Sequence, residues 1–135
     1  MILWLVTVSQ NIKSIKGNIK MNKVSQIKFL VELDINKIPQ KILWQADDAG
    51  FDGVKDAKSM FLSLWDKQEL VTLGMDLWTK EMTVEEMNIH FHQILVRMAE
   101  SYSRATQNSE IEFMIKKFAA ELANKLNLFN TGNQI

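Results

Sequence analysis

Residues 62–106 read LSLWDKQELVTLGMDLWTKEMTVEEMNIHFHQILVRMAESYSRAT, and this stretch decides the fold class. Its apolar residues alternate with polar ones as far as Trp78, which is the pattern of a strand with one buried face. From Thr83 onward the apolar residues recur about every 3.6 residues, as they do along one face of a helix. The stretch therefore predicts a β-hairpin followed by a long amphipathic helix.

Two strands, 59–65 and 70–78, form the predicted hairpin, and residues 66–69 form its four-residue loop. This loop length sets which residues face each other across the strands. On one side the predicted pairs are Met60 with Met75, Leu62 with Leu73, and Leu64 with Val71. On the other side they are Ser63 with Thr72, and Phe61 with Gly74. In the last pair the aromatic ring would cover the place of the missing glycine side chain.

Two further strands are predicted before the hairpin. Residues 25–34 alternate apolar and polar side chains, and residues 40–46 repeat the pattern after a turn that contains Pro39. The connection 47–56, DDAGFDGVKD, reads as a loop with two glycines and four acids. A run of strands followed by a run of helices is typical of an α+β domain.

Two helices complete the predicted domain, and each begins with a capping box in which a hydroxyl and a glutamate satisfy the first backbone N–H groups. Thr83 with Glu86 opens the first helix, and Ser109 with Glu112 opens the second. The apolar face of the first helix contains Val84, Met87, Phe91, Ile94, Leu95, Met98, Tyr102 and Ala105. That of the second contains Ile111, Ile115, Phe118, Ala119, Leu122 and Leu126.

We therefore expect an α+β fold, with a four-stranded antiparallel sheet followed by two C-terminal helices packed on one face. The face expected to contact the helices carries Ile27, Phe29, Ile42, Trp44, Met60, Leu62, Leu73 and Met75. A sheet face left in water is normally polar, yet the other face also carries large apolar residues. These are Leu30, Leu43, Phe61, Trp65, Leu70 and Trp78.

We predict that these six residues form a contact surface for a protein partner or for a second copy of the chain. An alternative is that Trp65 and Trp78 are local plugs that fold onto neighbouring loops of the hairpin. The two readings differ in what a substitution does, because a plug is needed for folding and a contact surface is not.

Composition limits the classes of function. The chain has 135 residues, 47% of them hydrophobic, which fits one globular domain and argues against disorder. It has no cysteine, so disulfides and thiolate metal sites are excluded. The 16 basic and 16 acidic residues balance, so no overall positive field attracts nucleic acid or anionic lipid. Nucleic-acid binding and membrane insertion are therefore not expected.

Residues 1–20 differ from the rest of the chain. They open with an apolar run that lacks a preceding basic region, unlike a signal peptide, and that is too short to span a bilayer. Met21 follows directly and precedes a clean strand pattern. We expect residues 1–20 to be an extension outside the fold, with Met21 as the natural start. The α+β domain is expected over 21–130, and a flexible tail over 131–135.

No catalytic, metal or cofactor site is predicted. His90 and His92 lie two apart, so on a helix they point about 200° away from each other and do not share a metal. The acids in 47–56 do not follow the spacing of a calcium-binding loop, and a solvated loop is the simpler reading. Glycine-rich phosphate loops and the G-x-S-x-G nucleophile motif are absent from the sequence. We do not expect an enzyme.

Four segments of the chain resemble the gliding motility protein GldC family. They are IKFLVELDINKIPQKILWQADD at 27–48, LSLWD at 62–66, DLWTKEMTVEEM at 76–87, and FHQILVRMAESYSRAT at 91–106. The resemblance runs from Met21 to about Leu128, and the family's proteins usually begin near the position of Met21. At Gly74 the chain departs from the family pattern, in which a basic residue is common.

The resemblance implies a small cytoplasmic accessory protein of the gliding machinery of bacteria of the Bacteroidota phylum. It supplies no catalytic residues and no cofactor, and the partner within the machinery is not named by it. A second hypothesis is an export-chaperone-like module that binds client proteins, because the order of four strands and two helices is similar to that of the SecB family. A small enzyme is the third hypothesis, which the lack of any catalytic constellation opposes.

Overall fold

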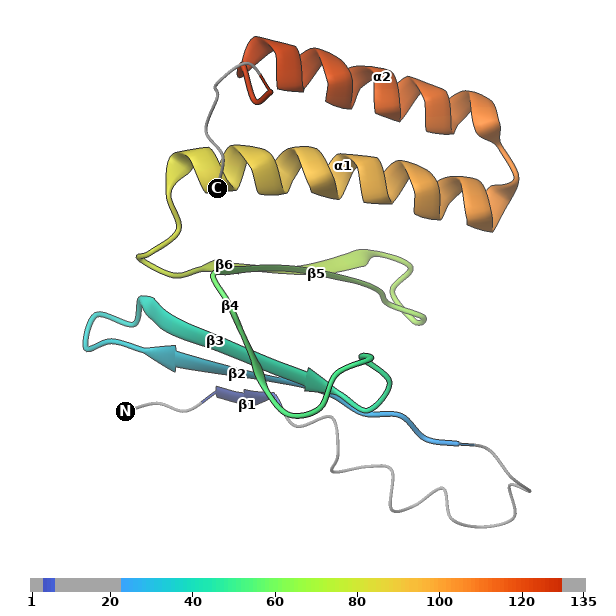
Figure 1. The fold of residues 1–135 in the computed structure, drawn as a ribbon. Coiled ribbons are helices and arrows are strands. Elements are labelled where there is room, and N and C mark those ends of the chain that lie inside the picture. Colours follow the sequence, from blue (N-terminus) through green and yellow to red (C-terminus); the bar gives the residue numbers. More distant parts are fainter. Residues whose placement is uncertain (1–3, 7–22, 130–135) are drawn as a thin grey trace. The chain divides into compact units, whose positions relative to one another are not determined.

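A computed structural model describes residues 4–6 and 23–129, and these form two compact units. The first, which we call the β unit, ends at Met82, and the second, the helical unit, begins at Thr83 (Figure 1). The structure thus confirms an α+β chain with antiparallel strands before two C-terminal helices. Of the expected extension 1–20, residues 4–6 are described; the expected tail 131–135 lies outside the described residues.

The larger sheet of the β unit has the strand order β1-β2-β3-β4, with all neighbours antiparallel. Its strands are β1 (Trp4–Val6), β2 (Ile27–Leu33), β3 (Pro39–Ala46) and β4 (Lys55–Ala57). Alternation along β2 and β3 places Phe29, Val31, Ile42 and Trp44 on one face and Leu30 and Leu43 on the other. Val31 and Ile42 are opposite each other and both are buried.

The second sheet is the hairpin of β5 (Ser59–Trp65) and β6 (Thr72–Trp78). The prediction of one four-stranded sheet was therefore wrong, because the predicted strands divide between two sheets. The physical reason is β4, which lies within and just after the segment predicted to be loop 47–56. It pairs with β3 through Ile42–Ala57 and Trp44–Lys55, and so occupies the edge of β3 that β5 would have needed.

The register of the hairpin was also predicted wrongly, by two residues. Ser63 faces Gly74, Leu62 faces Met75, and Phe61 faces Asp76. The loop is longer than predicted because Leu70 adopts the left-handed region, with φ 55°, and the Asp66 N–H donates to the Val71 carbonyl at 2.8 Å. A shift of two keeps every side chain on its predicted face, because side chains alternate with a period of two.

The helical unit consists of α1 (Val84–Thr106) and α2 (Ser109–Lys125). The predicted capping box of α1 is confirmed: the Glu86 N–H donates to Thr83 Oγ1 at 3.1 Å, and the Thr83 N–H donates to Glu86 Oε2 at 3.0 Å. The predicted box of α2 was wrong, because Asn108 is the cap. Its Oδ1 accepts from the Ile111 N–H at 3.2 Å. Asn108 is extended, with φ −103°, whereas Ser109 is already helical.

Small residues form the contact between the two helices. Ala99 of α1 and Ala119 and Ala123 of α2 are buried, and side chains of this size let helix backbones approach closely. Lys116 joins the helices, because its Nζ lies 2.7 Å from Glu112 Oε1 and 3.8 Å from Glu100 Oε1. Ala99 lies beside the predicted apolar face of α1, of which Val84, Phe91, Met98 and Tyr102 are exposed. That the helices pack on a sheet face stays a prediction.

Candidate functional site

The six residues predicted as a contact surface do not lie on one face. Leu30 and Leu43 are opposite each other on β2 and β3. Phe61, Trp65 and Trp78 lie on the β5–β6 hairpin, and Leu70 lies in its loop. The faces that carry Phe29 and Val31 on one sheet and Met60 and Leu62 on the other line a common cleft. Because side chains alternate, the predicted residues of the strands point away from this cleft on opposite sides of the β unit.

The outer face of the hairpin, which we call the tryptophan face, is formed by Ser59, Phe61, Ser63, Trp65, Thr72, Gly74, Asp76 and Trp78. Trp65 is 66% exposed and Trp78 is 53% exposed. Phe61 lies between the two tryptophans along the hairpin and is half-buried. Two exposed tryptophans on one small hairpin are a large apolar area for a protein surface, where Trp is enriched at contact sites.

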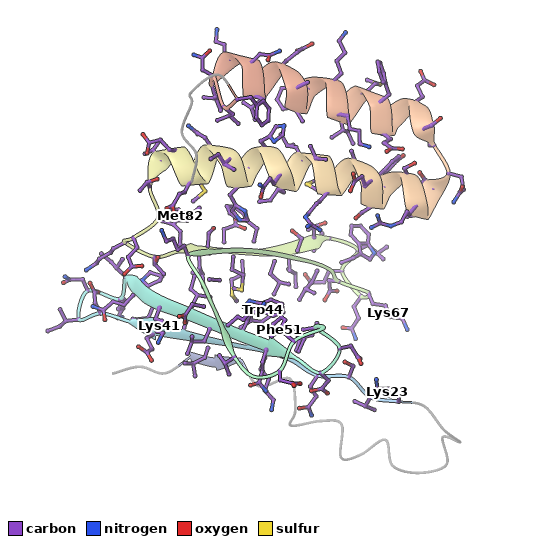
Figure 2. All side chains as sticks on the ribbon, viewed as in Figure 1. Lys23, Lys41, Trp44, Phe51, Lys67 and Met82 are labelled. Atoms are coloured by element: carbon purple, nitrogen blue, oxygen red, sulfur yellow. The ribbon has the colours of Figure 1, made fainter. Side chains whose placement is uncertain are left out.

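Leu70 stands beside this face rather than on it. It is 64% exposed, in a loop closed by Asp66, whose Oδ1 accepts from the N–H groups of Gln68 at 2.8 Å and Glu69 at 2.7 Å. The tip of the loop also carries Lys67, which points away from the hairpin (Figure 2). The loop therefore offers an apolar and a basic side chain at one end of the tryptophan face.

Gly74 leaves a gap in the tryptophan face. A Cβ at this position would meet no atom within 4 Å, so Phe61 does not cover it as predicted from the sequence. Ser63 lies opposite Gly74, and Trp65 is the next residue of β5 on the same face. The backbone of β6 is consequently accessible to a partner between the two tryptophans.

A second feature of the β unit is the cleft between the sheets, with a volume of about 380 Å³. It is lined by Phe29, Val31, Leu33, Lys37, Pro39, Met60, Leu62, Met75 and Leu77. From the sequence, four of these residues, Phe29, Met60, Leu62 and Met75, were expected on a face covered by helices. The alternation showed that they share a face, but it did not show that they would face each other across two sheets.

An ion pair joins the two sides of this cleft. Lys80, just after β6, pairs with Asp34 in the turn after β2. The Asp34 side chain is 7% exposed, and its Oδ1 also accepts from the N–H groups of Asn36 at 2.8 Å and Ile38 at 2.9 Å. The Lys80 ammonium, followed by the Ile38 N–H, holds the pKa of the Asp34 carboxyl below its ordinary value. Asp34 therefore orders the turn and connects it to the second sheet.

An aromatic contact holds the connection between β3 and β4 against the larger sheet. The rings of Trp44 and Phe51 meet edge to face with centroids 5.1 Å apart (Figure 2). Lys55 Nζ lies 3.9 Å from the centroid of the Phe51 ring. These contacts explain why a segment rich in glycine and acids returns to pair with β3.

The acids of this segment act as structural partners. Asp47 Oδ2 accepts from the Gln26 N–H at 2.9 Å, Asp48 pairs with Lys23 at 2.6 Å, and Asp56 lies 3.9 Å from Lys41.

On α1, His92 meets Phe129 edge to face with centroids 5.4 Å apart. Among residues 4–6 and 23–129, no group of three or more His, Cys, Asp or Glu is placed to hold a metal ion.

A family model described as gliding motility-associated protein GldC-like matches residues 39–128, from the first residue of β3 to just beyond α2. The chain belongs to the GldC-like family. The resemblance found in the sequence is thereby confirmed. Comparison with curated proteins found no match, and neither did comparison with solved structures. No helix of the described part of the chain is long and apolar enough to cross a membrane.

The GldC-like match includes five of the six predicted contact residues, with Leu30 outside it. It covers the whole hairpin and therefore the whole tryptophan face. Among the described residues, the candidate contact site is thus the tryptophan face, with its exposed Trp65 and Trp78.

Proposed function

We propose that this GldC-like chain is an accessory, non-catalytic protein of the gliding apparatus, located in the cytoplasm, and that it acts through protein contact. The family match supports the association with gliding motility. The exposure of Trp65 and Trp78 on one side of the hairpin is the observation that carries the contact surface. Tryptophan buried at an interface contributes more binding energy than most residues, so these two are the expected anchors.

The partner is proposed to be a protein of the gliding machinery, with a second copy of this chain as the alternative occupant. A partner of complementary shape would cover both tryptophans and fill the gap above Gly74. Asp76, between the tryptophans in β6, would accept hydrogen bonds from it. Light scattering of the purified chain separates the two occupants, because self-association through this face doubles the mass and disappears in Trp65→Ser.

The experiment that tests the proposal is a pull-down from the native gliding bacterium with the wild type and Trp65→Ser. Phe113→Ser is the matched control, because Phe113 is 68% exposed and lies on α2 in the helical unit. We expect Trp65→Ser to lose the partner and Phe113→Ser to retain it. Equal capture by all three proteins would refute the tryptophan face as the contact surface.

An export-chaperone-like, client-binding module is the second candidate. It is favoured by the spread of exposed apolar side chains over both units, including Trp65 and Trp78 on the hairpin and Phe113 and Phe118 on α2. A client-binding protein would suppress the aggregation of an unrelated unfolded protein, whereas a dedicated adaptor would not. Suppression that survives Trp65→Ser would favour this candidate over a dedicated contact surface.

A further inference from the structure

The walls of the cleft between the sheets are formed mainly by apolar side chains. Phe29, Val31 and Leu33 form one wall, and Met60, Leu62, Met75 and Leu77 form the other. Its volume of about 380 Å³ lies within the range of roughly 300–1,000 Å³ typical of small-molecule sites. Apolar walls that lack partner atoms lose dispersion contacts, so an apolar occupant of the right shape is favoured.

The chemistry of the walls selects against a peptide. A peptide carries an N–H and a C=O at each residue, and burying them without hydrogen bonds is costly. The side chains of both walls provide no hydrogen-bonding group. The volume is also a poor match for a phospholipid with two acyl chains. A single unbranched alkyl chain has no polar group to satisfy, so these walls accept it without that cost.

One charged side chain also lines the cleft. Of the described residues that line the cleft, Lys37 alone is charged, and it forms no ion pair with another described residue. Its position is fixed by the turn: φ is 62°, and its N–H donates to the Asp34 carbonyl at 2.9 Å. The neighbouring Asp34 carboxylate is already bound to Lys80 and two backbone N–H groups, so it does not neutralise Lys37.

We propose that the cleft binds a free long-chain fatty acid, with the alkyl chain between the two sheets and the carboxylate at Lys37. An apolar tail fits the walls, and an anionic head complements the one cation beside them. This site is distinct from the tryptophan face, because its residues lie on the opposite side of β5 and β6. It is independent of the proposed contact with the gliding machinery.

Calorimetric titration of the full chain with decanoate, dodecanoate and tetradecanoate, below their critical micelle concentrations, tests the tail. Each additional buried methylene group is expected to tighten binding about fourfold. Leu62→Trp fills the cleft and is expected to abolish binding, whereas Val71→Trp, in the hairpin loop outside the cleft, leaves it unchanged. If Leu62→Trp unfolds, Met75→Phe provides a smaller addition at the same wall.

Lys37→Gln tests the head, with Lys67→Gln as the control in a loop away from the cleft. We expect Lys37→Gln to weaken dodecanoate binding by about two- to fivefold, as for a solvent-accessible ion pair, and to leave dodecanol binding unchanged. Affinity that does not depend on chain length, or that survives both cleft-filling variants, would overturn the proposal. So would binding of phospholipid vesicles or of an apolar peptide without binding of the free acid.

Discussion

Asp34 and Lys80 form an ion pair that joins the turn after β2 to the segment after β6. These two segments follow strands of different sheets, and Lys37 and Leu77, three residues along the chain from Asp34 and Lys80, line the cleft between those sheets. The β unit is therefore two sheets that are connected by a polar contact as well as by apolar packing.

Replacing Asp34 by Asn is expected to lower the thermal unfolding midpoint at neutral pH. The pKa of Asp34 is lowered in the folded chain, by Lys80 first and by the turn N–H groups next. Such a group stabilises the fold above its unfolded pKa, which is near 3.8, and the contribution is lost as the pH falls through the lower folded pKa. The difference between wild type and Asp34→Asn should thus shrink in acid. The control is Asp56→Asn, because Asp56 and its partner Lys41 are both exposed. An equal decrease in the unfolding midpoint of Asp56→Asn would show that the Asp34–Lys80 pair has no special role.

Removing the cap of each helix tests the corrected helix starts. Thr83→Ala and Asn108→Ala are each expected to cost about 1 kcal/mol in the free energy of unfolding measured with urea. Ser109→Ala should cost much less, because its hydroxyl is not the cap. A loss at Ser109 equal to that at Asn108 would show that the second helix starts as the sequence first indicated.

The alanine contact between the helices is expected to tolerate no larger side chain. Ala119→Leu should destabilise the chain by roughly 1–3 kcal/mol, because it overpacks a contact in which Ala119 is buried. Ala120→Leu, at the adjacent exposed position, should change the free energy of unfolding by less than about 0.5 kcal/mol. Urea unfolding followed by circular dichroism measures both, and equal effects would place the helix contact elsewhere.

Gly74→Thr tests the hairpin register. In the observed register the Cβ of the new side chain meets no atom within 4 Å, and threonine favours strands. We expect a gain of about 0.5–1 kcal/mol in the free energy of unfolding. If Phe61 instead lay over Gly74, the added side chain would displace its ring and the variant would lose stability. Gly53→Ala is the contrasting control, because φ of 85° makes any side chain there unfavourable.

Much of the fold was predictable from local pattern. Alternation along the strands correctly separated Phe29 and Met60, which line the cleft, from Phe61 and Trp65, which lie on the tryptophan face. The T-x-x-E spacing correctly placed the start of α1 at Thr83. These predictions succeeded because each depends on residues that are close in sequence.

The division into two sheets was not predictable in the same way. β4 is three residues long, Lys55–Ala57, and has no alternating apolar pattern to reveal it. The free edge of β3 can pair with either β4 or β5, and the local sequence pattern does not show which. Pairing with β4 leaves the hairpin as a second sheet. The register error has a local cause, since nothing in the identity of Leu70 indicates a positive φ.

That the six residues bind a partner stays a prediction, but they do not share the single face expected of them. The tryptophans of the hairpin are exposed, as a contact surface requires, but Leu30 and Leu43 lie on the far side of the larger sheet. The cleft with Lys37 was not predicted, because it exists only between two sheets that the sequence presented as one.

We propose that the exposed tryptophans of the hairpin bind a protein of the gliding apparatus. The most direct measurement compares partner capture from native cells by wild type, Trp65→Ser and Phe113→Ser, together with the unfolding free energy of each. We expect Trp65→Ser to lose the partner while its free energy of unfolding changes by less than about 0.5 kcal/mol, as at other exposed positions. Full capture by Trp65→Ser, or its failure to fold, would contradict it.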